Sequence, residues 1–147
     1  MTIVVKRVDV ELTKPIRAQI LRPGLPLSHS SYPGEENPRS GAFAAFEGDA
    51  ILGVSSVMPE QCPWNPNIGD AWRLRGMAVL PQARNRGVGA RLLEAALTHV
   101  RAEAGKFIWC NARVPALSLY LRAGFTIEGE EFELPHIGPH RQMWLAL

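Results

Sequence analysis

"MAVLPQARNRGVGARLLEAAL", residues 77–97, is the stretch that decides the fold, because an apolar strand runs there through a turn rich in arginine and glycine into an amphipathic helix. Apolar residues recur at three- and four-residue spacings from position 92 to 100, the period of one buried helix face. The first N–H groups of a helix lack intrahelical partners, and the helix dipole makes that end positive. The turn is therefore suited to bind an anion such as phosphate.

Two features of this turn favour the phosphate interpretation. Gly87 and Gly89 leave room for phosphate oxygens to approach the backbone N–H groups, which side chains would prevent. Five arginines and no acidic residue lie between Asp70 and Glu94, and guanidinium groups offer planar sets of donors to phosphate. An ordinary charged turn has the same composition, so spacing alone leaves both interpretations open. The turn is neither a dinucleotide fingerprint nor a P-loop, because it lacks G-x-G-x-x-G and the G-K-[ST] ending.

The rest of the sequence predicts strands separated by helices and loops. Alternating apolar residues and turn residues predict strands over 3–8, 41–47, 50–58, 70–80, 106–111, 125–134 and 141–147. Helices are predicted within 12–24, between Gly87 and Gly105, and over 114–124, and a proline-rich loop with room for one helical turn over 22–41. Gly48 and Asp49 predict a hairpin turn, and Gly76 predicts a bulge. This order predicts an α/β fold, a mixed sheet of about seven strands covered by helices.

Length and composition favour a single domain spanning residues 1–147. At 46% hydrophobic and 20% charged residues, the chain can bury a globular core. The net charge of +2 and the scattered aromatic residues argue against nucleic acid as a partner. The first residues lack a signal-peptide pattern and no apolar run has membrane-spanning length, which predicts a cytoplasmic protein without a membrane partner. Cys62 and Cys110 match no metal or redox spacing, so we expect free, buried thiols and no metal site.

Two motifs resemble the GNAT family of N-acetyltransferases, and in particular its small bacterial stand-alone members. The family signature for binding acetyl-CoA, R/Q-x-x-G-x-G/A, is matched by Arg84, Gly87 and Gly89. "CNARVPALSLYLRAGF", residues 110–125, is similar to the strand and helix that follow in that family. Its recurrent positions are Ala116, Tyr120, Gly124 and Phe125. The resemblance implies the family's fold, with about seven strands splayed in the middle of the sheet and about four helices.

The resemblance also implies a reaction and the residues that bind its cosubstrate. The reaction is the transfer of an acetyl group from acetyl-CoA to a primary amine of a small molecule or peptide. The backbone of Met77, Ala78 and Val79 would pair with the pantetheine arm. The loop expected to hold the pyrophosphate consists of Arg84, Asn85, Arg86, Gly87, Val88, Gly89 and Ala90. Asn111 is a further expected cofactor-binding residue, and Arg113 or Arg122 would reach the adenosine phosphate. A homodimer is an expected assembly, because many relatives are dimers.

The expected catalytic residues come partly from the resemblance and partly from elimination. Tyr120 matches the family's tyrosine that protonates the leaving sulfur, although a buried helical aromatic fits its spacing equally well. Where some members carry a glutamate base this sequence has Arg73, which excludes a carboxylate base at that position. The remaining base candidates are Glu35, Glu36, Glu60, Glu133 and His136. We rank His136 and Glu133 first, because "FELPHIG" is expected to end near the acceptor.

Acidic residues predominate in the segments expected to surround the acceptor, 22–41, 59–69 and 128–139. Such charge would attract a cationic amine, and it is equally compatible with loops that only keep the protein soluble. The missing glutamate leaves an alternative function open, a non-catalytic CoA-binding or regulatory module. A nucleic-acid binder that uses the arginines is a third alternative, which the mild net charge disfavours.

Overall fold

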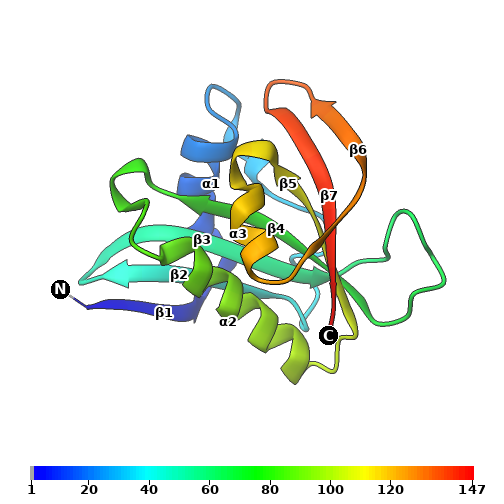
Figure 1. Cartoon of the computed structure of the whole chain (residues 1–147). Coiled ribbons are helices and arrows are strands. Elements are labelled where there is room, and N and C mark those ends of the chain that lie inside the picture. The colour runs from blue at the N-terminus through cyan, green and yellow to red at the C-terminus, as the bar shows by residue number, and fades with distance from the viewer. Residues whose placement is uncertain (1) are drawn as a thin grey trace.

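The computed structural model describes residues 2–147, which form one seven-stranded sheet with helices on both faces (Figure 1). The strand order is β1-β2-β3-β4-β5-β7-β6. The strands are β1 (Ile3–Val8), β2 (Gly41–Glu47), β3 (Ala50–Pro59), β4 (Ala71–Val79), β5 (Phe107–Arg113), β6 (Thr126–Leu134) and β7 (Gly138–Ala146). Neighbouring strands are antiparallel except for β4 and β5, which are parallel. The predicted mixed α/β sheet is thus confirmed.

Within residues 2–147, three α-helices and four 3₁₀ turns connect the strands. The helices are α1 (Lys14–Leu21), α2 (Val88–Ala102) and α3 (Leu117–Arg122). The turns are η1 (Val10–Thr13), η2 (Leu27–Ser30), η3 (Pro81–Ala83) and η4 (Val114–Ala116). The expectation of about four helices is wrong by one, because the prolines in 22–41 lack the N–H donors that a second helix after β1 would need. In the described part of the chain, no helix has the length and apolar character needed to cross a membrane.

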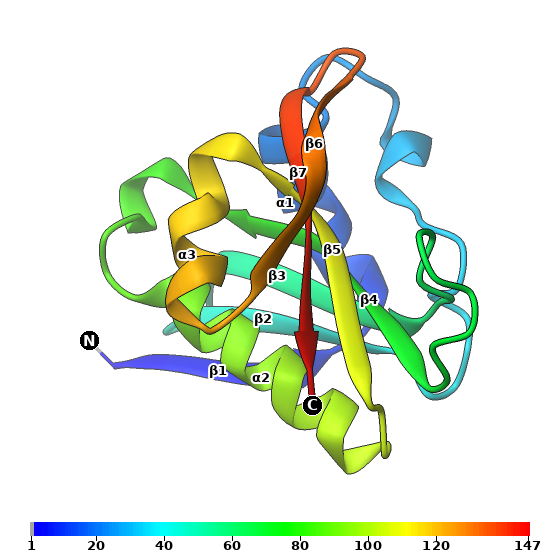
Figure 2. The same cartoon turned by 45° about the vertical axis from the view of Figure 1, so that its right-hand side comes forward.

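The two faces of the sheet carry separate apolar cores, with α1 and α2 on opposite sides (Figures 1 and 2). On one face, Leu92 and Leu93 of α2 pack in a cluster that includes Phe43. On the other face, Ile16 of α1 packs in a cluster that includes Ala44. Phe43 and Ala44 are successive residues of β2, and successive strand side chains point to opposite faces. Alternate residues of the strand therefore pack against α2 on one face of the sheet and against α1 on the other.

β4 and β5 separate after a short parallel pairing, as the resemblance led us to expect. The pairing runs only from Ala71 opposite Phe107 to Arg73 opposite Trp109. Both strands then continue, β4 to Val79 and β5 to Arg113, and Figure 2 shows them diverging. The edge of β4 that faces β5 consequently has no strand neighbour beyond Arg73 among the described residues.

Gly76 forms the predicted bulge in β4. Val54 pairs with Ala78 and Ser56 pairs with Arg75, so two residues of β4 lie opposite one residue of β3. Gly76 has φ +68°, and a Cβ atom there would lie 2.7 Å from Arg17 Nε. Glycine is required because both the backbone conformation and the close approach exclude a side chain.

The closing hairpin of β6 and β7 places β7 between β5 and β6. β7 begins at Gly138, earlier than the predicted start at residue 141, because its ladder with β6 extends to the pair Leu134 and Gly138. His140 is therefore a strand residue, and its side chain is buried.

Candidate active site

A cleft lies where β4 and β5 separate, and we call it the splay cleft. Its volume is about 100 Å³. Its lining consists of residues 73–77 of β4, residues 110–113 of β5, Leu21, Arg22 and Tyr32 from the segment before β2, Ala116 and Tyr120 from the η4 and α3 segment, and Leu134, Ile137 and His140 from the closing hairpin. Of the residues that the sequence analysis expected to bind the cosubstrate or take part in catalysis, the cleft therefore contains Met77, Asn111, Arg113 and Tyr120.

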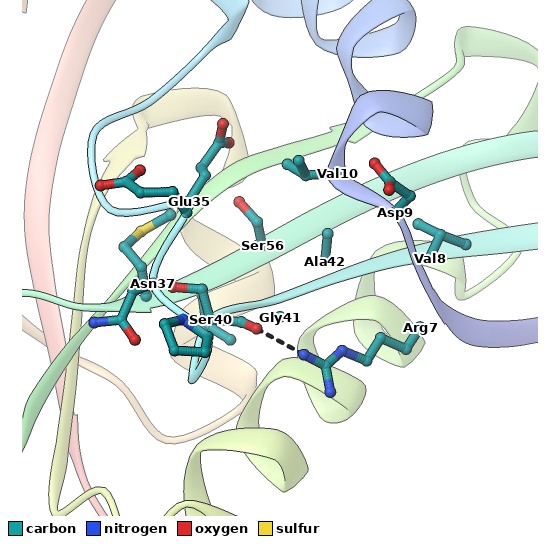
Figure 3. A pocket seen from close by; sticks show the side chains of 14 residues that line it. Arg7, Val8, Asp9, Val10, Glu35, Asn37, Ser40, Gly41, Ala42 and Ser56 are labelled. Carbon is teal, nitrogen blue, oxygen red and sulfur yellow. Dashed lines mark hydrogen bonds between the residues drawn. The ribbon is translucent and has the colours of Figure 1, made fainter.

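A larger hollow of about 260 Å³ lies beside β2 and β3, next to the segment that follows β1 (Figure 3). Glu35 and Glu36 line it, and Arg7 at its rim donates a hydrogen bond of 2.9 Å to the carbonyl oxygen of Ser40. Its lining includes none of the expected cosubstrate-binding residues. The smaller splay cleft is therefore the better candidate for an active site.

Tyr120 projects from α3 into the splay cleft. Its side chain is 4% exposed and packs edge-on against the ring of Phe125, with the ring centroids 5.4 Å apart. Its hydroxyl has no hydrogen-bond partner among residues 2–147 and is not fully enclosed. Burial, together with the neighbouring Cys110, raises the pKa of Tyr120 well above its usual value. The hydroxyl is thus protonated at neutral pH and able to donate a proton into the cleft.

His140 reaches the same cleft from β7 and was not singled out from the sequence. Its side chain is 4% exposed and packs against Phe132. Nδ1 lies 2.8 Å from the carbonyl oxygen of Gly138, which makes Nδ1 the donor and leaves the Nε2 lone pair free in the neutral ring. Burial lowers the pKa of His140, so the neutral form is favoured near pH 7. A neutral imidazole with a free nitrogen can accept a proton.

The base candidates ranked first from the sequence lie outside the splay cleft. Glu133 is an exposed residue of β6, and His136 is exposed in the turn between β6 and β7 with φ +68°. Glu60 is held by Arg73, with 3.1 Å between Oε2 and Nη1. None of these side chains lines the cleft, so its geometry favours His140 as the proton acceptor.

The predicted phosphate-binding loop follows β4 and leads into α2. Asn85 and Gly87 adopt left-handed backbone conformations, with φ +64° and +75°. Across the described chain, the N–H groups of residues 85–90 donate no hydrogen bond, and the first of α2 to do so is that of Arg91, to Gly87 O at 3.2 Å. α2 is 15 residues long, so its dipole adds positive charge at this end. The loop thus presents a run of free donors to an anion.

Gly89 in this loop is not required by the fold itself. A Cβ atom there would lie 3.4 Å from Leu119 Cδ2, an ordinary contact, and its φ is not positive. The small residue is therefore better explained by clearance for a ligand than by packing. Gly87 differs, because its left-handed conformation alone favours glycine.

The three arginines of the loop have different surroundings. Arg84 is exposed and has no ion-pair partner in the described structure. Arg86 pairs with Glu47 of β2, and this hydrogen bond lowers the pKa of Glu47. Arg91 donates a hydrogen bond of 2.6 Å to the carbonyl oxygen of Ile3. Arg84 is therefore the guanidinium free to bind a phosphate.

Two further observations suit an extended ligand that runs from the loop to the splay cleft. The edge of β4 that contains Met77, Ala78 and Val79 has no strand neighbour on the β5 side. The Oδ1 atom of Asn111 is buried without a hydrogen-bond partner among the described residues, and Asn111 lines the cleft. An orphaned buried acceptor is costly unless a donor reaches it, so a ligand N–H group is expected there.

The charge of the splay cleft reverses the expectation of an acidic acceptor site. Four arginines and His140 line it, and no carboxylate of the described residues does. The acidic residues expected there are used elsewhere or exposed: Glu35 pairs with Arg17, Glu60 pairs with Arg73, and Glu128, Glu130, Glu131 and Glu133 lie on β6. Within residues 2–147, no group of His, Cys, Asp or Glu side chains is arranged to hold a metal ion.

A buried charged network holds Tyr32 at the cleft. Arg17 of α1 is fully buried; it pairs with Glu35 and donates 3.0 Å hydrogen bonds to the carbonyl oxygen of Ser30 and to Ser56 Oγ. Glu35 also accepts the N–H of Tyr32 at 3.1 Å. The guanidinium of Arg75 lies over the Tyr32 ring. The sequence contains one signal for this arrangement, a tyrosine, Tyr32, within a loop otherwise rich in proline.

Comparison with known proteins places these features in a family context. Residues 12–125 match the model of the acetyltransferase (GNAT) family. A relative from Bacillus subtilis (strain 168), described as the uncharacterized N-acetyltransferase YitI, is 34% identical over 144 residues, which make up 97% of this chain and 95% of the relative.

Solved structures agree with the observed fold. An IAA acetyltransferase from Bacillus cereus ATCC 14579 has a TM-score of 0.74 at 18% identity, covering 99% of this chain and all of its own. An acetyltransferase from Bacillus subtilis in complex with CoA has a TM-score of 0.71 at 16% identity, covering 99% of both chains. At these identities the likeness concerns the fold.

Proposed function

This protein belongs to the acetyltransferase (GNAT) family, and we propose that it transfers the acetyl group of acetyl-CoA directly to a primary amine of a small molecule or peptide. It is an acetyl-CoA-dependent N-acetyltransferase. The observation that carries the direct mechanism is the splay cleft, which is lined by both Tyr120 and His140, and in which the Tyr120 hydroxyl and His140 Nε2 have no hydrogen-bond partner among the described residues. One group can give a proton and the other can take one, as the attack of a neutral amine on a thioester requires, because the nitrogen loses one proton and the sulfur gains one.

The residues present fit acetyl-CoA as the cosubstrate. The free N–H groups of residues 85–90 and the Arg84 guanidinium would bind the pyrophosphate. The open edge of β4 at Met77, Ala78 and Val79 would pair with the amide groups of the pantetheine arm, and Asn111 Oδ1 would accept a hydrogen bond from it. This arrangement would place the thioester in the splay cleft.

The proton transfers follow from the two free groups. The ammonium form of the acceptor first loses one proton to solvent. As the neutral amine nitrogen then attacks the acetyl carbonyl carbon, His140 Nε2 takes a second proton from it. As the C–N bond forms, the C–S bond breaks and its electron pair goes to sulfur, which takes a proton from Tyr120. A backbone N–H of β4, at Met77 or Val79, would polarise the carbonyl oxygen. Solvent then returns a proton to Tyr120 and removes one from His140.

We propose His140 as the base in place of the first-ranked Glu133 and His136. The supporting observation is position, because His140 lines the cleft and the other two side chains are exposed outside it. The absence of a glutamate at the position of Arg73 is then compatible with catalysis, since the imidazole supplies the proton acceptor from β7.

Mixing the protein with acetyl-CoA and a panel of primary amines tests this function, with free CoA followed by a thiol reagent and products identified by mass spectrometry. Both cysteines are buried, and burial raises the pKa of Cys110 to about 12, so the native protein should add little to the thiol signal. We expect an N-acetylated product and one CoA released per product. Tight binding of acetyl-CoA without acetylation of any amine would instead support the non-catalytic CoA-binding module.

A further inference from the structure

The splay cleft holds positive charge that the protein does not neutralise. Of the four arginines that line it, only Arg73 has an ion-pair partner among the described residues, Glu60. Arg22 donates only to the carbonyl oxygen of Leu21, at 3.0 Å. The guanidinium groups of Arg75 and Arg113 form no hydrogen bond or ion pair with any described residue. Partly buried charges without partners are costly, so a partner from outside the chain is expected.

Arg75 is the member of this group whose position is best defined. Its guanidinium carbon lies 4.1 Å from the centroid of the Tyr32 ring, and Tyr32 is held by the backbone hydrogen bond to Glu35. This cation–π contact uses none of the guanidinium N–H groups as hydrogen-bond donors, so they remain available to a ligand. None of these nitrogens is fully enclosed. Arg75 thus presents a fixed fork of donors to the cleft.

The electrostatic surroundings of Arg75 point the same way. Burial, and then the charge of Arg73, lower the pKa of Arg75 to about 10, while Tyr32 and Glu60 act in the opposite direction. Arg75 remains charged at neutral pH, yet its charge is destabilised by the site. An anion beside it would relieve both effects.

We propose that the acceptor amine carries a negatively charged group, a carboxylate or a phosphate, which Arg75 binds in the splay cleft. This inference rests on the proposed function, because it concerns the second substrate of that reaction. The phosphates of acetyl-CoA do not account for the charge of Arg75, since no residue of the loop 84–90 lines the cleft and Arg113, not Arg75, is the cleft residue expected to reach the adenosine phosphate. The acceptor class is therefore an anionic primary amine, such as an amino acid or an aminoalkyl phosphate.

Matched pairs of amines test the proposal. Each pair contains an anionic amine and a neutral-tailed counterpart: L-amino acids beside their amides, and O-phosphoethanolamine beside ethanolamine. Steady-state kcat/KM is measured for the wild type, Arg75→Gln and Arg75→Lys, with Arg101→Gln on the exposed face of α2 as the matched control. Binding of the same compounds is measured by calorimetry on protein saturated with CoA, which occupies the phosphate loop.

For the wild type and Arg101→Gln, we expect the anionic member of at least one pair to be preferred by tenfold or more in kcat/KM and to bind the CoA-saturated protein. Arg75→Gln should remove that preference without changing the KM for acetyl-CoA, and Arg75→Lys should retain part of it, because the charge persists. The amino acid and phosphate pairs identify which anion is bound.

Two results would overturn the inference: neutral amines acetylated as well as their anionic counterparts, or no anionic compound bound in a manner that depends on Arg75. Failure of the proposed function gives a different outcome, in which anionic compounds bind through Arg75 and no amine is acetylated.

Discussion

The fully buried guanidinium of Arg17 pairs with the carboxylate of Glu35, whose side chain is 8% exposed, and this pair joins α1 to the loop before β2. The same carboxylate accepts the N–H of Tyr32, and the Tyr32 ring lies beneath Arg75. A buried ion pair thus positions the residues at one wall of the splay cleft.

Replacing Glu35 by glutamine should destabilise the protein. The amide keeps the size of the carboxylate but leaves Arg17 charged and buried without a counter-ion, which costs about 3–5 kcal/mol. Urea unfolding at pH 7 measures the free energy of unfolding of the variant and the wild type. Glu36→Gln, at the exposed neighbouring position, is the control and should change it by less than about 0.5 kcal/mol. Equal stabilities of the two variants would contradict the role of the pair.

Gly76→Ala should destabilise the fold through both backbone strain and steric contact. The added Cβ would lie 2.7 Å from Arg17 Nε in a left-handed backbone conformation, and we expect a loss of about 2–4 kcal/mol. Gly129→Ala separates the two causes, because Gly129 has φ +72° with nothing near its Cβ position. Equal losses of unfolding free energy in the two variants would show that the contact with Arg17 costs nothing.

Arg84→Gln and Arg86→Gln should differ in their effect on acetyl-CoA binding. Arg84 has no ion-pair partner among the described residues, whereas Arg86 is held by Glu47. Losing a charged hydrogen bond to phosphate should raise the KM for acetyl-CoA about tenfold in Arg84→Gln and much less in Arg86→Gln. The measurement is made at constant ionic strength, and the reverse order would contradict the proposed phosphate contact.

The pH dependence of kcat/KM should report the protonation of the His140 imidazole. The base must be neutral, so activity falls as the pH drops through the depressed pKa of His140, below 6.5. The groups that bear on this pKa, after burial, are the carbonyl of Gly138, Arg113, Arg22 and Glu133. His140→Gln should remove the fall in activity that protonation of His140 causes, and should lower kcat/KM by about 100-fold at neutral pH. The fall caused by protonation of the amine substrate itself should remain. An unchanged acid limb would assign the base elsewhere.

Much of the fold could be predicted from local patterns, because the alternation of apolar and polar residues and the identity of turn residues determine the structure of a few neighbouring positions. The hairpin at Gly48 and Asp49, the bulge at Gly76 and the amphipathic α2 are all of this kind. The first residues of β7 were missed because Gly138 and Pro139 are typical of a loop, and pairing with β6 extends the strand through them. His140 went unnoticed for that reason.

The charge of the cleft could not be predicted, because it depends on which distant residues meet. Counting acidic residues in loops gave an acidic acceptor site. In the structure, Glu35 pairs with Arg17 and Glu60 pairs with Arg73, and each pair joins two different elements. Arg75, in contrast, lines the cleft and has no ion-pair partner among the described residues. Side-chain pairing across the fold carries information that composition does not.

The most direct test of direct acetyl transfer in the splay cleft is the kinetics of Tyr120→Phe. The substitution keeps the ring packed against Phe125 and removes only a hydroxyl that has no partner among the described residues. We predict a kcat lowered by about 100-fold, with the dissociation constant for acetyl-CoA within twofold of the wild type. A kcat equal to that of the wild type would contradict the account.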